Sequence, residues 1–249
     1  MAGTAPTPAQ AQRLGRVVGD IGGRFMTDPA AYARAGEVGL EPGLGVYIIG
    51  RFGVLGRVDA GVVTAAAAFW NPATIRAAWE PALDHCDPAS VAAWYADVCA
   101  DHGRTHFAEA PGLARWCELA EVVADTAPVF GLATFAGWRA MPRPDDAPAR
   151  AALVLHVLRE LRFGLHANAT VAAGLSPSVA MRTTPGMDAM VAAFGWEEPL
   201  EPVTDADVAR RKEIEATTNE LSAVSLGGLD ADRAEELITL AEGIATAAN

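Results

Sequence analysis

Hydrophobic residues recur along most of the chain at the three- and four-residue spacing of helices, and β-branched residues rarely alternate with polar ones. Capping residues directly precede a proline at Asp28, Asn71 and Asp87, which is a strong signal for a helix start. The pattern predicts helices near 9–19, 28–39, 58–70, 71–83, 87–103, 111–125, 128–140 and 146–174. The last of these is long enough to be two helices bent near Gly164, and residues 43–57 form a short apolar helix or strand.

The pattern changes after residue 176. Short apolar pieces lead to a Pro- and Glu-rich break, "EEPLEP", before Thr204 caps a charged helix that runs to about Leu226. A final amphipathic helix covers 230–247. We therefore predict an all-α, multi-helix orthogonal bundle: a disordered segment 1–8, a helical body 9–176 with a ligand pocket, and a smaller helical, degenerate winged-helix-like part 177–249. The charged, amphipathic C-terminal helices also predict a homodimer.

Composition narrows the function. The 249 residues are 51% hydrophobic, enough for a sizeable core, and carry a net charge of −12. Such an acidic chain makes nucleic acid an unlikely partner, because phosphate contacts need clustered cations. Three unpatterned cysteines and the lack of an apolar leader favour the cytoplasm. No apolar run reaches the roughly 18 residues of a membrane span, so we expect no membrane contact.

The stretch "VLRELRFGLH", residues 157–166, places several polar groups in an apolar helix. Helical spacing puts Arg159, Arg162 and His166 on one stripe, where two guanidiniums and an imidazole could hold a carboxylate or phosphate. The alternative is structural. In that case the arginines pair with Glu160 or with acids elsewhere, such as Asp145 and Asp146, and His166 is an ordinary core residue.

A second set of polar side chains interrupts the apolar sequence near the predicted helix 58–70, which is the most hydrophobic one. Arg51 interrupts an apolar stretch that also contains Tyr47, and Trp70 and Asn71 end the helix 58–70. If these helices pack against 150–170, their polar side chains converge on one cavity with apolar walls. We therefore expect Tyr47, Arg51, Trp70 and Asn71 to bind a ligand together with Arg159.

The sequence predicts no metal site and names no cofactor. His102 and His106 have a spacing that could hold a metal, with Cys99 one turn earlier, but Gly103 weakens that helix and no second cluster completes the ligand set. We therefore interpret them as surface histidines. The glycine-rich "GRFGVLGR" lacks the Gly-Lys-Ser/Thr of a phosphate-binding loop.

Four stretches resemble the SalK-like family of actinobacterial helical proteins, whose members are often labelled helix-turn-helix or MarR-like. They are "YIIGRFGVLGRVDAGVVTAAAAFWNPATI", "VLRELRFGLHANATVAAGL", "FGW" and "RRKEIEATTNEL", within residues 20–245. The residues that match the family pattern are Arg51, Leu55, Gly56, Asn71, Arg159, Glu160, Arg162 and His166. Leu161 and the triplet 163–165 replace a histidine and a Gly-Asp-Gly of the family, which implies a more apolar pocket here.

The resemblance also implies a winged-helix C-terminal part. Only "EEPLEP" separates Trp196 from Val203 and Thr204, which leaves little room for the second recognition helix and a wing. We therefore predict a small-molecule-binding protein. If it is an enzyme, we expect it to act in specialised metabolism, with His166 and Arg162 as catalytic residues. Its ligand is apolar with an acidic or carbonyl oxygen. The alternatives are a ligand-responsive winged-helix regulator and a non-catalytic dimeric module.

Overall fold

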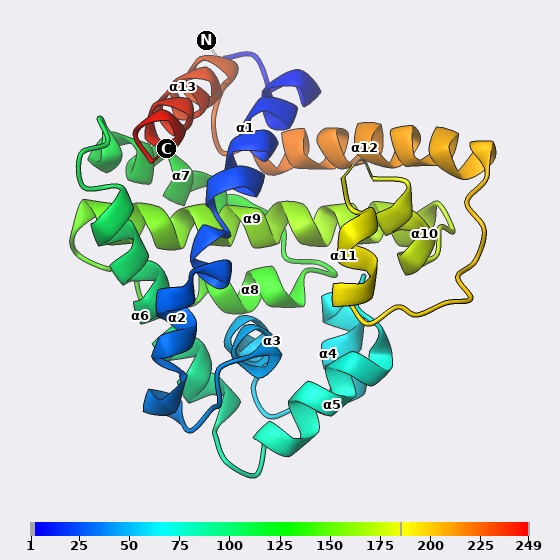
Figure 1. The fold of residues 1–249 in the computed structure, drawn as a ribbon. Helices are drawn as coiled ribbons and strands as arrows, with labels where there is room; N and C mark the ends of the chain where they lie inside the picture. The colour runs from blue at the N-terminus through cyan, green and yellow to red at the C-terminus, as the bar shows by residue number, and fades with distance from the viewer. Residues whose placement is uncertain (1–2, 185, 249) are drawn as a thin grey trace.

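The computed structural model describes residues 3–184 and 186–248, and within these ranges the protein is helical and contains no strand (Figure 1). This confirms the predicted all-α bundle. The helices of the body are α1 (Pro8–Ile21), α2 (Pro29–Ala33), α3 (Leu44–Phe52), α4 (Ala60–Ala67), α5 (Pro72–Ala82), α6 (Pro88–His106), α7 (Leu113–Thr126), α8 (Ala133–Arg139) and α9 (Ala147–Ala172). After them come α10 (Pro177–Arg182), α11 (Asp188–Ala193), α12 (Asp205–Ser225) and α13 (Ala231–Ala247). Short 3₁₀ segments are η1 (Arg24–Thr27), η2 (Ala35–Val38) and η3 (Gly53–Leu55).

Side-chain caps fix where the helices begin. Asp28, Asn71 and Asp87 each accept a hydrogen bond from a backbone N–H in the first turn of the helix that follows, and a proline occupies that first turn. Thr204 forms a capping box with Asp207 at the start of α12. The undecided stretch 43–57 is helical, as α3 followed by η3.

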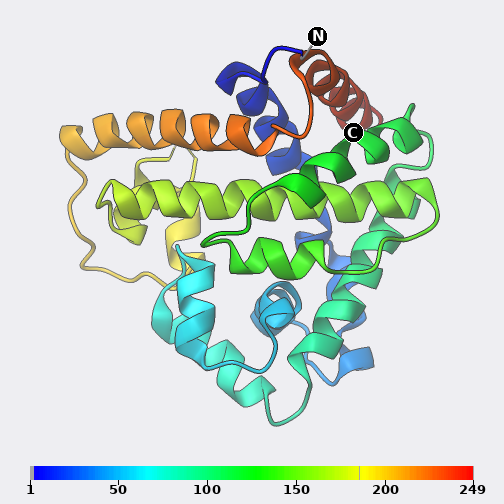
Figure 2. The same cartoon turned by 180° about the vertical axis from the view of Figure 1, so that it is seen from behind.

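The 26-residue helix α9 runs through the centre of the molecule. It packs against α6, α7, α8 and α12, and the view from behind shows α7 and α8 on either side of it (Figure 2). The helix is continuous at Gly164, where the sequence suggested a bend. A Cβ there would lie 2.6 Å from Leu132 Cδ2, so the glycine allows close packing against the segment before α8.

The C-terminal helices share the main hydrophobic core with the body. Helix α13 contacts α1 and α7, and its Leu237, Ile238 and Ile244 are fully buried in that core. Near the N-terminus, the Thr4 carbonyl accepts a hydrogen bond from Ala231 N–H, and Thr7 caps α1. Residues 1 and 2 of the segment 1–8 lie outside the described residues. None of the described helices is both long and apolar enough to cross a membrane.

A smaller hydrophobic cluster lies where α12 crosses the end of α9. It joins the end of α9 to α10 and to the middle of α12, and its buried members are Ala169, Leu175, Val179, Ala180 and Ile214. This cluster holds the first half of α12 over α9, so polar side chains from the two helices face each other beside it. The candidate site lies there.

Candidate functional site

A pocket of about 330 Å³ opens between α1, α3, α9, α10 and α12. Five of the residues singled out in the sequence line it: Tyr47, Arg51, Arg159, Arg162 and His166. The other polar lining residues are Thr184, Arg211 and Glu215, and the apolar wall consists of Val18, Phe69, Phe163, Ala180, Met181, Met187 and Phe194. Its volume is at the lower end of the range of small-molecule sites, roughly 300–1,000 Å³.

Arg51 forms the floor of the pocket and is fully committed to protein partners. Its Nε and Nη2 donate to the two carboxylate oxygens of Glu160 at 2.9 and 3.0 Å, and Nη1 donates to the Tyr47 hydroxyl at 2.6 Å. The guanidinium also lies 4.3 Å from the ring centre of Phe163. Burial is the largest effect and would raise the pKa of Glu160, but the neighbouring charges, with Arg51 first, and the Arg51 hydrogen bond together outweigh it and lower that pKa. Because the Tyr47 oxygen accepts from Arg51, its own O–H remains available as a donor.

Arg159 extends this network toward the opening. Its Nη1 donates to Glu160 Oε1 at 2.8 Å, which agrees with the structural alternative for this residue. Asp146, another partner considered from the sequence, caps α9 and pairs with Arg104 instead. Glu160 therefore forms ion pairs with two arginines, so this end of the pocket has an excess of positive charge.

His166 is held as a neutral imidazole with a defined tautomer. Thr218 Oγ1 donates its proton to the Ile214 carbonyl at 2.7 Å, so at 3.0 Å it accepts from Nδ1–H of His166. Burial, and next the charge of Arg211, lower the pKa of His166 to about 4. Nε2 therefore keeps its lone pair at neutral pH and can accept a proton or a hydrogen bond at the pocket wall.

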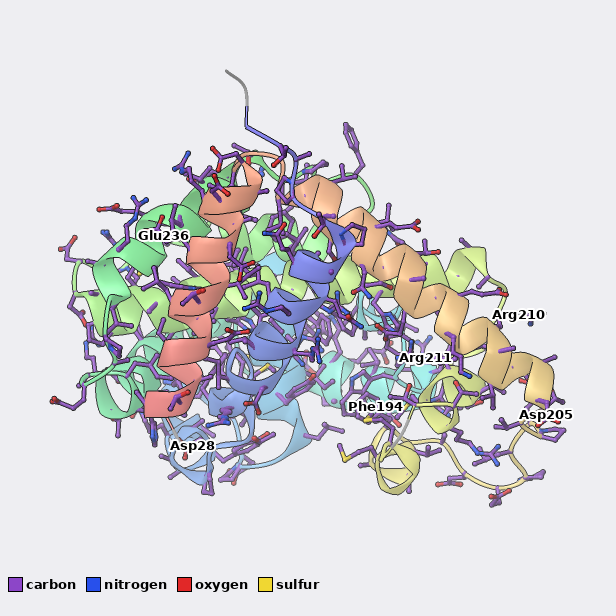
Figure 3. All side chains as sticks on the ribbon, turned by 90° about the horizontal axis from the view of Figure 1, so that it is seen from above. Asp28, Phe194, Asp205, Arg210, Arg211 and Glu236 are labelled. Carbon is purple, nitrogen blue, oxygen red and sulfur yellow. The ribbon has the colours of Figure 1, made fainter. Side chains whose placement is uncertain are left out.

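Helix α12 supplies a second pair of charges, which the sequence reasoning did not place in the site. Arg211 Nη2 pairs with Glu215, four residues on, at 2.6 Å, and its Nε donates to Thr184 Oγ1 at 3.0 Å. Arg162 reaches across from α9 to the same Glu215 at 3.3 Å. Arg211 Nη1 is buried and has no hydrogen-bond partner among the described residues. Figure 3 shows Arg211 on the side of α12 that faces Phe194, while its neighbour Arg210 points outward.

The balance of charge in this pocket differs from that of the whole chain. Four arginines line it, and within the part of the chain that the structure describes their carboxylate partners are Glu160 and Glu215. With His166 neutral, two positive charges are in excess, in a protein whose net charge is −12. A partly enclosed cavity strengthens that local field.

Trp70 and Asn71 occupy different places from those expected. Trp70 is buried behind the pocket wall, stacked on Phe194 at 4.2 Å between ring centres and 5.5 Å from Tyr47. Asn71 caps α5, since its Oδ1 accepts from Ala73 N–H at 2.8 Å, and it lines a separate groove with Trp196. The structure thus brings five of the seven predicted site residues together and places these two outside the pocket lining.

The chain matches the helix-turn-helix family over residues 11–249, so it belongs to that family. Searches among curated proteins and among solved structures returned no match.

Proposed function

We propose that this protein binds a small organic anion with an apolar body in the pocket between α9 and α12. The observation that carries the proposal is the excess of two arginine charges over carboxylates in a cavity whose walls are otherwise aromatic and aliphatic. Arginine suits carboxylate and phosphate groups because its planar fork donates two parallel hydrogen bonds.

The polar groups of the pocket define which ligand atoms it favours. Arg211 Nη1 and the Tyr47 hydroxyl are donors without an acceptor among the described residues, and His166 Nε2 is an acceptor. They suit a ligand with an acidic or carbonyl oxygen at one end. Phe69, Phe163 and their apolar neighbours suit a hydrocarbon or aromatic body.

An enzyme built on this site would use the same residues. The neutral Nε2 of His166 would take a proton from the substrate, and Arg162 would stabilise the developing negative charge. Binding alone requires no such step, and we place the binding function first.

The test is calorimetric titration with matched probes that share a body and differ in charge. The probes are 4-phenylbutyrate, octanoate, and the two alcohols with the same carbon skeletons. We expect the carboxylates to bind more tightly than the alcohols. The Arg211→Met variant should lose about tenfold or more of the carboxylate affinity, because a hydrogen bond to a charged group contributes about 1.5–3 kcal/mol.

Arg210→Met is the matched control, since it removes the same charge from the neighbouring position, which faces away from the pocket (Figure 3). This variant should keep the affinity of the unaltered protein. Equal binding of acid and alcohol, absence of binding for every probe, or equal losses in both variants would count against the proposal.

Family membership favours a second candidate, a ligand-responsive regulator that binds DNA. The cations near α10 and the start of α12 are Arg182, Arg210, Arg211 and Lys212, and the first turn of α12 carries Asp205 and Asp207. Retention on duplex DNA at low salt, falling steeply as salt rises, would support this candidate. Retention that does not depend on salt, or none, would exclude it.

We also propose a homodimer in a reducing, cytoplasmic setting. The three cysteines are unpaired thiols. Since α13 buries its apolar face within the chain, the exposed apolar residues of α12 are the candidates for a dimer contact: Val208, Leu221 and Val224. Light scattering gives the mass, and Val224→Glu should convert a dimer into a monomer.

A further inference from the structure

A cluster of three side chains lies far from the pocket, where the N-terminal segment meets the end of α6. His102 and His106 occupy the last turns of α6, and Asp28 lies between η1 and α2. One ligand atom from each of the three residues lies within 4.8 Å of the others. Figure 3 places Asp28 on the opposite side of the molecule from Arg211.

The Asp28 carboxylate is held in a fixed orientation. Its Oδ1 accepts a hydrogen bond from Ala30 N–H at 2.9 Å, which caps α2, and its Oδ2 lies 3.2 Å from His102 Nδ1. Two donor atoms bound to one tetrahedral zinc ion at about 2.0–2.1 Å are about 3.3 Å apart. The existing separation of oxygen and nitrogen therefore already matches one edge of a zinc coordination sphere.

The imidazole ring of His102 makes few polar contacts within the protein. Its side chain is 10% exposed, Nδ1 contacts Asp28, and Nε2 is buried without a hydrogen-bond partner among the described residues. The ring of His106 lies 4.2 Å away between centres. His106 is exposed and is the last residue of α6, so its side chain can rotate to close the ligand set. Cys99, one turn earlier, is buried in the core and is not part of the cluster.

We propose that Asp28, His102 and His106 form a binding site for a divalent transition-metal ion of the zinc type. Two imidazole nitrogens and one carboxylate oxygen favour such an ion over Mg²⁺ or Ca²⁺, which prefer oxygen ligands. Three protein ligands leave the remaining position to water at the exposed edge of the cluster. The positive charge of Arg24 acts on His102 and disfavours a cation at this site. The Arg24 guanidinium is, however, paired with Asp20 at 3.0 Å.

An ion at this site would join α6 to the segment that begins α2. Asp28 and His102 are 74 residues apart in the chain, and in the folded protein one hydrogen bond joins their side chains. A metal that binds the folded protein and not the unfolded chain stabilises the fold by mass action. Bound Zn²⁺ should therefore raise the melting temperature.

The test uses full-length protein without an affinity tag, stripped with EDTA and titrated with Co²⁺ at pH 7.5. Visible absorption follows the ion, and Zn²⁺ competes it off. We expect one ion per chain and no response to Mg²⁺. His106→Ala and Asp28→Asn should each weaken binding by at least about tenfold, the loss typical of altering even a supporting residue at a metal site.

These variants keep the fold intact, because His106 is exposed and asparagine caps a helix as well as aspartate does. His85→Ala, at an exposed histidine elsewhere, is the control and should bind Co²⁺ like the unaltered protein. The proposal is overturned if millimolar Co²⁺ produces no saturable binding. Unchanged affinity in both variants would overturn it as well, because the ion would then lie elsewhere.

Discussion

Arg51 and Glu160 face each other through two parallel hydrogen bonds, of 2.9 and 3.0 Å, inside the protein. The two side chains are 2% and 0% exposed and belong to residues 109 positions apart in the chain. The pair fixes α3 against α9 and sets the floor of the pocket. It also positions the Tyr47 hydroxyl, which Arg51 contacts directly.

The first prediction concerns removal of this pair. Glu160→Gln keeps the shape of the side chain but leaves the Arg51 charge buried without a counter-charge. We expect the free energy of unfolding to fall by about 3–5 kcal/mol, measured by urea denaturation. Glu80→Gln is the control, because Glu80 pairs with Arg76 on the surface, and its loss should cost less than about 1 kcal/mol. Similar losses in the two variants would contradict the structural role given to Glu160.

The second prediction concerns the tautomer of His166. Thr218→Val removes the oxygen that accepts from Nδ1–H, so that nitrogen loses its partner. Nitrogen-15 NMR of the imidazole should show a proton on Nδ1 in the unaltered protein and a shift toward the other tautomer in the variant. Thr183→Val, at another threonine that donates to a helix carbonyl, should leave the His166 signals unchanged. A proton on Nε2 in the unaltered protein would show that the hydrogen-bond directions at Thr218 are reversed.

Most of the fold could be predicted from local signals in the sequence. Helix starts such as that at Asp87 depend on one capping side chain and one proline, so they can be predicted without knowing the neighbours. The stripe Arg159, Arg162 and His166 follows from helical spacing alone. The continuity of α9 could not be predicted, because Gly164 reads as a helix breaker until Leu132 is known to pack against it.

The rest of the site depends on tertiary contacts. Arg211 and Glu215 come from α12, and their spacing of four residues is an ordinary surface ion pair until α12 is laid over α9. Asn71 shows the opposite case, because its capping role is local and sufficient to explain the residue. Asp28 likewise reads as a cap, and only the fold brings it to His102.

The third prediction is a loss of stability in mild acid. His156 is fully buried, with Nδ1 3.3 Å from the Gly22 carbonyl, and burial lowers its pKa to about 3. The unfolded chain binds this proton near its usual pKa of 6.5, so between pH 6.5 and 3 the unfolded state carries more protons. The contribution of the neutral His156 to the free energy of unfolding is therefore fully present above pH 6.5 and is lost as the pH falls toward 3.

The variant His156→Met isolates this contribution. In urea titrations between pH 4.5 and 5.5, the slope of unfolding free energy against pH should drop by about 1.4 kcal/mol per pH unit, the value for one proton. His85→Gln, at an exposed position, should keep the original slope. A slope unchanged by His156→Met would mean that the buried imidazole is already protonated in the folded protein.

The last prediction concerns Gly103, which lies between the two histidines of the proposed metal site. In an open helix, replacing glycine with alanine raises stability by about 0.4–1 kcal/mol, because the unfolded chain loses conformational freedom. At Gly103 a Cβ would lie 2.4 Å from the Pro148 carbonyl oxygen and 2.6 Å from Ala152 Cβ, since α6 and α9 touch there. Gly103→Ala should therefore lower stability by about 1–3 kcal/mol, as overpacking does. The matched control is Gly19→Ala in α1, where nothing lies within 4 Å of the added Cβ, and it should raise stability. Urea denaturation of both variants measures the difference, and stabilisation at Gly103 would mean that α6 and α9 are farther apart than the structure places them.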